Sequence, residues 1–284
     1  MSKVYQAPSG DPEMNQAFER ARETFRFFWR EVYWERRRII PALGMTAVKL
    51  PFIDEADADE EDPTTEHMWV TDVEFDGETL SGTLLNDPNN LEDYSEGDEV
   101  CGDMENISDW IYTADDRAFG AYTVNLLRSR MSPRSMAEHD KMWGLDFGDP
   151  ADIRVELSEV IAPLPIEKPG GGLFAGLGSW LKKKEPAVVP PASVTAPAGF
   201  RDHPMCINSI DKIKEMIHTH RDDCLAPDES GLTTLHREAL AGNLAIVRLL
   251  LEVGADRAAK TPAGHTPADL ARIIGWKEIA AELG

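Results

Sequence analysis

The side chains of this 284-residue chain that could do acid–base chemistry surround one histidine in the sequence. His67 follows Glu66, and Asp98 and Asp109 supply further carboxylates in the same half of the chain. An imidazole titrates near neutral pH, so a histidine that shares a cleft with carboxylates could act as a general base. The alternative is a histidine in a structural hydrogen bond. An enzyme built around His67 requires a cleft in which these groups converge, and packing that buries His67 would exclude it.

Two further clusters contain residue types that bind metals. One has histidines and cysteines within 22 positions, and its members are His203, Cys206, His218, His220 and Cys224. Their spacing fits no common zinc module, and a helix would turn His218 and His220 to different sides. The other is the run 54–66, which carries eight carboxylates in 13 residues. It lacks the glycine and the flanking helices of a calcium-binding EF-hand loop, so we expect a solvated loop, no metal and no cofactor.

The motifs of the common enzyme classes are absent from the sequence. It contains no P-loop, no serine nucleophile elbow, no zinc-protease helix and no Cys-x-x-C pair. The glycines of 170–178 match neither the phosphate-loop spacing nor the dinucleotide spacing. We therefore expect a protein that is not an enzyme.

The first half of the chain changes from one long helical pattern to short strand patterns. Residues 14–38 carry apolar side chains at helical spacing, and Asp11 followed by Pro12 is a good helix start. Strand patterns follow at 46–52, 66–75, 79–85, 99–101 and 107–112, and Asp76-Gly77 is a hairpin turn between two of them. The pattern predicts an α+β domain in which a long helix packs on a small antiparallel sheet.

This half contains a series of short sequence blocks, which are VKLPF at 48–52, EHMWV at 66–70, GTLLNDP at 82–88, GDEV at 97–100, ISDW at 107–110, GAYT at 120–123, RMSP at 130–133 and GLDF at 144–147. These blocks resemble the bacterial YegJ-like family, a domain of unknown function. The resemblance covers residues 14–150. It implies a fold but no activity and no functional residues, and members of the family occur beside ankyrin-like segments. We take 1–165 as one domain.

The C-terminal part repeats itself at a spacing of 33 residues. Two glycines and a threonine recur one period later, and the pairs are Gly231 with Gly264, Thr233 with Thr266, and Gly242 with Gly275. This period is typical of helix-turn-helix units, which bury their apolar faces by stacking on neighbours. Counting back one period from 246–250 reaches the apolar residues of 210–217, which predicts a degenerate first unit.

Residues 231–256 resemble an ankyrin repeat along their whole length, and 264–271 open the next one. The resemblance implies a short all-α stack of about two and a half repeats over 201–284, in which His236 fastens one helix pair to the next. Glu238 stands where a small packed residue is usual, so it either reaches solvent or marks a contact. Partners of ankyrin stacks usually meet loop tips and inner helices, which assigns partner binding to Arg237, Glu238, Arg257, Lys260, Thr261 and Asp269.

Prolines and glycines interrupt regular structure through 166–200, which we expect to be a linker. Inside it, the segment from Gly172 to Lys184 places apolar side chains on one helical face above three lysines. A helix on a membrane surface has this pattern, but the glycines disfavour a stable helix. We therefore expect a linker segment that docks on this chain or on a partner, and no contact with a membrane.

Negative charge is concentrated in the first domain. Residues 1–165 hold 36 acidic and 15 basic residues, and the whole chain has a formal net charge of -22. An acidic domain repels phosphate backbones, which argues against nucleic acid as a ligand and favours a basic partner. The same charge could serve solubility alone. No apolar run approaches the roughly 20 residues of a membrane span, no signal peptide is recognisable, and cysteines are few, so we expect a cytoplasmic protein.

Together these patterns predict a bacterial, non-enzymatic protein that binds an unidentified protein partner through its ankyrin stack. The alternative is an immunity or antitoxin-like inhibitor, in which the acidic domain blocks the basic active site of a toxin.

Overall fold

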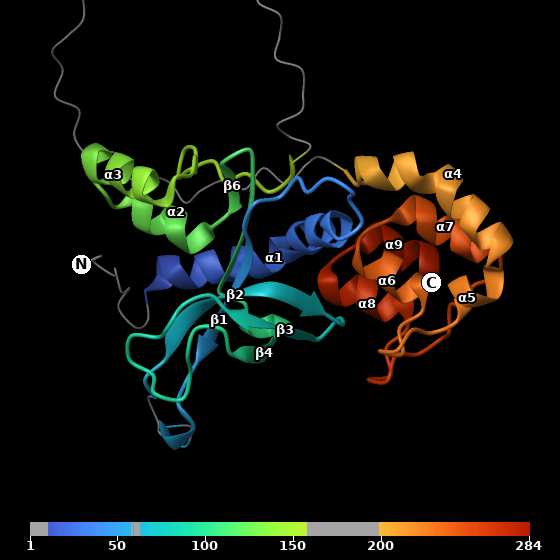
Figure 1. Ribbon diagram of the computed structural model, residues 1–284, viewed down its shortest axis with the longest axis horizontal. Coiled ribbons are helices and arrows are strands. Elements are labelled where there is room, and N and C mark those ends of the chain that lie inside the picture. Colours follow the sequence, from blue (N-terminus) through green and yellow to red (C-terminus); the bar gives the residue numbers. More distant parts are fainter. Residues whose placement is uncertain (1–10, 58, 60–62, 158–198) are drawn as a thin grey trace, which may run out of the picture.

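The computed structural model describes residues 11–57, 59, 63–157 and 199–284. The linker segment from Gly172 to Lys184 lies outside the described residues. An α+β part built on a sheet lies beside a stack of short helices (Figure 1). This architecture confirms the fold class expected from the sequence, a long helix on a small antiparallel sheet followed by a short helical repeat stack.

The α+β part begins with the long helix α1, Pro12–Glu35. Asp11 caps its start, because the Asp11 carboxylate accepts a hydrogen bond from the backbone N–H of Glu13 at 3.0 Å. In the second half of α1 every residue from 27 to 34 is buried. A single apolar stripe cannot account for such a run, since it leaves one side of a helix in solvent. The helix must therefore be covered from more than one side.

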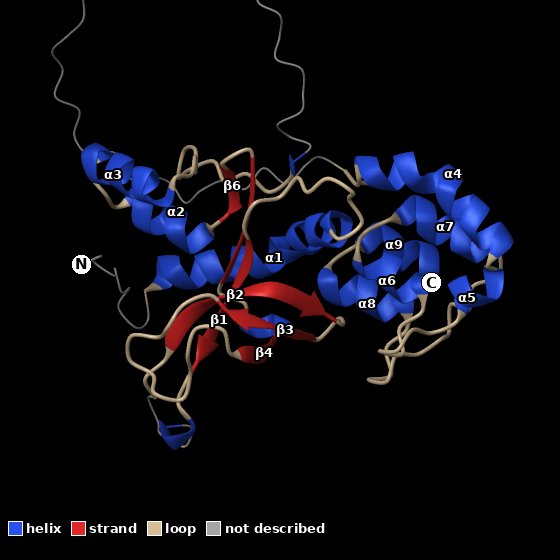
Figure 2. Cartoon of the chain, viewed as in Figure 1, coloured by secondary structure: helices blue, strands red, loops and turns tan. Residues whose placement is uncertain are grey.

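One antiparallel sheet covers the first side of α1, with the strand order β4-β3-β2-β1-β5-β6. The elements between α1 and the end of this part are β1 Thr46–Phe52, η1 Glu55–Asp57, β2 Glu66–Phe75, β3 Thr79–Leu84, β4 Glu99–Asp103, η2 Met104–Asn106, β5 Asp109–Ala114, β6 Arg117–Gly120, α2 Tyr122–Ser129 and α3 Pro133–Trp143. The turn predicted at Asp76-Gly77 joins β2 to β3. Figure 2 shows α1 lying across the strands.

Aromatic side chains hold α1 on the sheet. Phe25 and Trp29 meet the ring of Phe75 edge-on, with ring centroids 5.4 and 5.5 Å apart. Phe28 packs against Trp110 of β5, and the indole N–H of Trp110 donates to the backbone carbonyl of Ala21 at 2.9 Å. Rings of this size bury large apolar areas, and the indole finds an acceptor on the helix itself.

The C-terminal part is a stack of antiparallel helix pairs. Its helices are α4 Pro204–Thr219, α5 Arg221–Leu225, α6 Thr234–Leu240, α7 Leu244–Glu252, α8 Pro267–Ile274 and α9 Lys277–Leu283. The degenerate first unit expected at 210–217 falls within the single helix α4. Gly242 ends α6 with a φ of +77°, and a Cβ there would lie 2.5 Å from the indole of Trp276. Backbone conformation and close packing both require glycine at this repeated position.

The two parts pack directly against each other. Helix α1 contacts α6 and α8, the first helices of the two full repeats (Figure 1). Buried apolar side chains from both parts form one continuous cluster. The repeat stack is therefore the second cover of α1, which explains why the second half of that helix is buried on all sides.

Candidate partner-binding site

Each full repeat begins with a capping box, in which Thr233 pairs with His236 and Thr266 pairs with Asp269. The His236 Nδ1 accepts the backbone N–H of Thr233 at 3.1 Å, so the ring proton is on Nε2. Nε2 then donates to the backbone carbonyls of Ala259 and His265 at 3.1 and 3.2 Å. Burial lowers the pKa of His236, which favours this neutral form. His236 thus fastens the loop of the following repeat, as the ankyrin resemblance implied.

Four of the six residues expected to bind a partner keep some exposure. Arg257 and Lys260 are exposed on the loop between α7 and α8, and neither has an ion pair within the described residues. Arg237 is half-buried and pairs with Asp228. Asp269 is half-buried and caps the start of α8, accepting the backbone N–H and the hydroxyl of Thr266. Only the two loop cations therefore present charge that no neighbour within the described residues neutralises.

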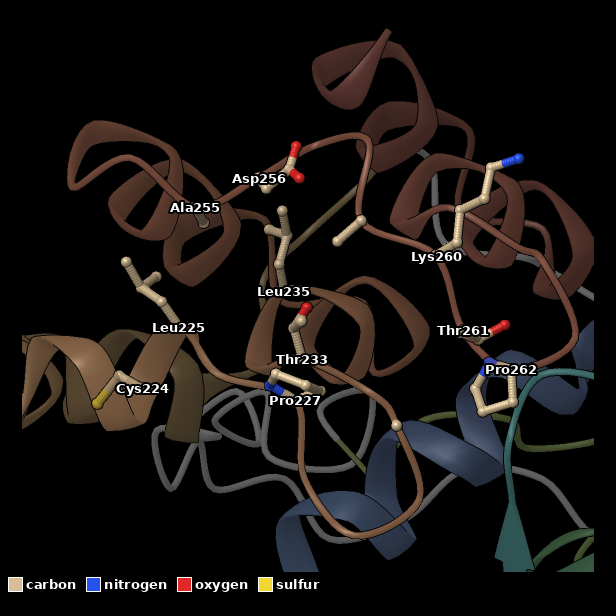
Figure 3. Close-up of a pocket in the computed structure, with 12 residues that line it drawn as sticks. Cys224, Leu225, Pro227, Thr233, Leu235, Ala255, Asp256, Lys260, Thr261 and Pro262 are labelled. Atoms are coloured by element: carbon tan, nitrogen blue, oxygen red, sulfur yellow. The ribbon is translucent and has the colours of Figure 1, made fainter.

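The loops that connect the helix pairs enclose a groove of about 470 Å³ (Figure 3). Its apolar walls come from the end of α5, from α6 and from the loops on either side, and they include Leu225, Pro227, Leu235, Ala255, Ala259 and Pro262. Asp256 and Lys260 also line this loop groove. A half-open apolar hollow with charged groups beside it is suited to the side chains of another protein.

Glu238, by contrast, faces the α+β part. It is 2% exposed, its carboxylate accepts the hydroxyl of Tyr33 and the side-chain amide of Asn243, and it forms an ion pair with Arg37 at 3.3 Å. The side-chain oxygen of Asn243 accepts the indole N–H of Trp34 at 3.0 Å. The sequence departure at Glu238 therefore marks a contact within the chain, and this side chain is not available to a partner in this conformation.

The hairpin between β2 and β3 makes a second contact with the repeats. A Cβ at Gly77 would lie 2.4 Å from the side chain of Leu270 on α8, so the turn approaches the stack closely. Beside it, the carboxylate of Glu78 meets the His265 imidazole at 2.5 Å. Thr261 is 6% exposed, and its hydroxyl accepts the backbone N–H of His265 at 3.2 Å. Thr261 therefore supports the loop that meets the hairpin and, although it is nearly covered, it also lines the loop groove.

The five candidate zinc ligands do not converge on one point. His203 is buried and stacks on Trp34 with ring centroids 5.7 Å apart. Cys206 is buried, and burial raises the pKa of its thiol, whereas the histidines at the end of α4 are exposed. Across residues 11–57, 59, 63–157 and 199–284, no group of three or more ligand-type side chains is arranged to hold a metal ion. In the same ranges, no helix is long and apolar enough to cross a membrane.

The acid–base residues are also separated. The His67 ring stacks on Phe18 with centroids 5.1 Å apart, and its Nδ1 hydrogen-bonds to the hydroxyl of Ser108 at 2.6 Å. Asp98 accepts a backbone N–H in its own loop, and Asp109 is fully buried. Among the residues that the structure describes, no hydrogen bond or ion pair joins either carboxylate to His67. The convergence that a general base would need is not found in this part of the chain.

Asp109 instead holds the start of α2. Its carboxylate accepts the backbone N–H groups of Tyr122 and Thr123, each at 2.8 Å, and the Thr123 hydroxyl at 2.5 Å. The Lys49 ammonium donates to the same hydroxyl at 3.1 Å and lies 4.5 Å from the centre of the Trp69 ring. Burial raises the pKa of Asp109 and lowers that of Lys49, and each charge partly offsets the shift of the other. This pair anchors a helix to the sheet.

We expect the substitution His67→Gln to reduce the loss of stability on acidification. Desolvation, followed by the nearby Lys49 ammonium, lowers the pKa of His67 to about 4, although the residue as a whole is exposed. The unfolded chain binds a proton at this residue near pH 6.5. The free energy of unfolding should therefore fall as the pH drops from about 6.5 to about 4, and the variant should lose this part of the slope.

The measurement is urea unfolding of both proteins at several pH values in that window. His218→Gln is the matched control, because His218 is an exposed histidine on α4. If His67→Gln and His218→Gln changed the pH slope equally, the His67 ring would be as well solvated as an ordinary surface histidine.

The contact between the two parts involves Tyr33, Trp34 and Asn243, and none of them could be assigned a role from the sequence. One signal was present, since 27–34 combines Phe27, Tyr33 and Trp34 with the predicted apolar stripe on several sides of one helix. A helix with this composition is expected to be covered twice.

Comparisons with known proteins match both parts of the chain. A family model described as an uncharacterized protein conserved in bacteria (DUF2314) matches residues 11–147. A protein of Neisseria meningitidis serogroup B that is named as an ankyrin repeat protein is 36% identical over 279 residues, which covers 98% of this chain and 96% of the relative. The protein YegJ of Escherichia coli K12 is 37% identical over 81 residues, or 28% of this chain and 48% of YegJ.

A human protein is similar over a shorter stretch. Protein phosphatase 1 regulatory subunit 27 is 34% identical over 84 residues, which covers 30% of this chain and 54% of the human protein. Together with the neisserial relative and YegJ, these matches confirm both resemblances noted in the sequence, the bacterial domain and the ankyrin repeats.

Proposed function

This chain belongs to the same family as the neisserial ankyrin repeat protein, with a DUF2314 domain ahead of the repeats, and from that premise we propose that it acts by binding another protein. The name of the human relative, a regulatory subunit of a phosphatase, describes a protein that assembles with an enzyme. The composition of the chain supports the same proposal, because its sequence lacks the common catalytic motifs.

The observation that carries the proposal is the loop groove. Ankyrin stacks offer two surfaces to partners, the first helices of the repeats and the tips of the connecting loops. Here α1 covers α6 and α8, so the first helices already have an occupant within the chain. The loop groove remains open beside Arg257 and Lys260. A partner segment with an apolar side chain and a nearby carboxylate fits this surface.

Photo-cross-linking of the whole chain tests this placement. A photoreactive amino acid is introduced at Lys260, or at Lys141 as a control, because Lys141 is exposed on α3 far from the groove in sequence. Both proteins are expressed in the source cell and irradiated. We expect one protein to be captured from position 260 and not from position 141. Capture of the same proteins from both positions, or of none from position 260, would contradict the assignment to the loop groove.

A second candidate function rests on charge alone. The first domain, with 36 acidic and 15 basic residues, has the electrostatics of an inhibitor that blocks a basic active site. This immunity-like role predicts binding to a basic toxin that weakens steeply as salt is added. This role is tested by measuring the affinity of the whole chain for toxins that are encoded beside it, at about 50 mM and about 500 mM salt. Surface charge is screened much more strongly at the higher concentration. Binding that does not change with salt would exclude it.

A further inference from the structure

A second groove lies at the boundary between the two parts of the chain. It has a volume of about 720 Å³ and runs between α1 and the turn that joins α8 to α9. In Figure 1 the C-terminal half of α1 approaches these helices. Its size falls in the range of small-molecule sites, roughly 300–1,000 Å³, and such sites are frequent where domains meet. This groove is separate from the loop groove, since the two share no lining residue.

The charge of this groove is opposite to that of the whole chain. Five cations line it, and they are Arg22, Arg26, Arg30, Arg201 and Lys277. Three carboxylates accompany them, those of Glu23, Glu156 and Glu278. A local excess of positive charge in a chain of net charge -22 attracts anions to this place and not to the surrounding surface. The three α1 arginines are spaced four residues apart, which puts them on one side of the helix.

One pair of these charges is already matched. The Arg30 guanidinium is 3% exposed, forms an ion pair with Glu156 and donates to the backbone carbonyl of Arg201 at 3.1 Å. Its Nε is buried and has no hydrogen-bond partner within the described residues. Arg30 is therefore fixed in place, and it repels a second guanidinium one helical turn away.

That second guanidinium belongs to Arg26, and within the described residues no carboxylate pairs with it. It lies 4.6 Å from the ring centre of Phe27 and 5.7 Å from that of Trp276. Among the residues that the structure describes, its one hydrogen bond is to the backbone carbonyl of Glu23. Burial, followed by the Arg30 charge, lowers the pKa of Arg26, and the Glu156 and Glu278 carboxylates that line the groove oppose this shift only in part. A guanidinium has five N–H donors, so most of those on Arg26 have no acceptor within the described part of the chain.

We propose that this boundary groove binds a small polyvalent oxyanion, whose carboxylate or phosphate groups accept the free N–H donors of Arg26 and reach Lys277 on the repeat side. The planar guanidinium matches both kinds of oxyanion, because each can accept two parallel hydrogen bonds from it. The rings of Phe27 and Trp276 hold the Arg26 guanidinium in one orientation before the ligand binds, which lowers the entropic cost of binding. A ligand held from both sides also ties the repeat stack to the α+β part.

Calorimetric titration of the whole chain tests the proposal with two probes, pyrophosphate and citrate, at constant ionic strength. We expect saturable binding of at least one probe. Arg26→Gln keeps the first two methylene groups and removes the guanidinium, and it should raise the Kd at least about tenfold, the loss expected for a hydrogen bond to a charged group. Arg134→Gln is the matched control, since Arg134 is an arginine on α3 whose side chain is 88% exposed. Its Kd should equal that of the wild-type chain.

Each outcome is decisive. Binding of pyrophosphate alone would identify a phosphate ligand, and binding of citrate alone would identify a carboxylate ligand. Saturable binding by neither probe, or an equal Kd in Arg26→Gln and the wild-type chain, would overturn the proposal. Lys277→Gln tests whether the ligand contacts both parts of the chain, because Lys277 is exposed on the repeat side of the groove. An unchanged Kd in that variant would show that the ligand does not reach Lys277 and would overturn that part of the proposal. Circular dichroism of every variant confirms that it is folded.

Discussion

Replacing Glu238 by alanine is expected to lower the free energy of unfolding by about 2–4 kcal/mol, as for the loss of one partner from a buried polar network. The Glu238 side chain is 3% exposed and satisfies Tyr33, Asn243 and Arg37 together. Without it, the Tyr33 hydroxyl and the Asn243 amide lose their acceptor in a place that water does not reach. Arg37 is 40% exposed and can turn to solvent, so the charge pair accounts for the smaller share of the loss.

This substitution should also change the shape of the unfolding transition. The network joins α6 to the end of α1, and the wild-type chain should unfold in one cooperative step because the two parts share a continuous core. With the network removed, we expect the repeat stack to unfold before the α+β part. Urea unfolding followed by tryptophan fluorescence and by circular dichroism should then give two midpoints where the wild-type chain gives one.

Glu252→Ala is the matched control, because Glu252 is an exposed glutamate on the neighbouring helix α7. It should leave the midpoint within about 0.5 kcal/mol of the wild-type value. A double-mutant cycle with Tyr33→Phe isolates the hydrogen bond between the two parts. If the effects of Glu238→Ala and Tyr33→Phe were fully additive, the two side chains would not interact in solution and the docking of the domains would be wrong.

The same residue shows how far the sequence could lead. The repeat period and its recurring glycines and threonines could be identified from the sequence, since each depends on local backbone geometry. The sequence also showed that Glu238 is unusual, because a carboxylate stands where a small residue is usual. The residues that contact Glu238 could not be predicted, because Tyr33 and Arg37 lie some 200 residues away in the chain. A pattern shows that a face is apolar or polar, but the partner of that face is set by tertiary packing.

The candidate acid–base residues show what could not be predicted from the sequence. His67 and Asp109 suggested chemistry because their types can do it, and residue type carries no information on distance. In the structure β1 separates β2 from β5, with His67 on β2 and Asp109 on β5. Asp109 is turned toward the start of α2, where it replaces a local cap. The residue before that helix, Ala121, has a φ of +56° and gives no side-chain cap of its own. The need for a distant carboxylate there could not be predicted from the sequence of α2.

Asp109→Ala is accordingly expected to be among the most damaging single substitutions, with a loss of about 3–5 kcal/mol. Asp109 is 0% exposed. Its removal leaves the first backbone N–H groups of α2 and the Thr123 hydroxyl without an acceptor. It also leaves the Lys49 ammonium without the opposite charge that favours it in a buried position. Thermal and urea unfolding of the whole chain measure the loss, and Asp103→Ala, which removes an exposed carboxylate from β4, should have little effect.

The double variant Asp109→Ala with Lys49→Met separates the two contributions. If the stranded ammonium matters, removing it should restore part of the stability that Asp109→Ala loses, although Lys49→Met alone destabilises the wild-type chain. The part of the lost unfolding free energy that Lys49→Met does not restore measures the contribution of Asp109 as the cap of α2. A double variant no more stable than Asp109→Ala would show that Lys49 escapes to solvent when Asp109 is absent, and that the carboxylate acts only as the cap of the helix. A loss below about 1 kcal/mol for Asp109→Ala itself would contradict both roles, because removing a fully buried acceptor of four hydrogen bonds should cost more than this.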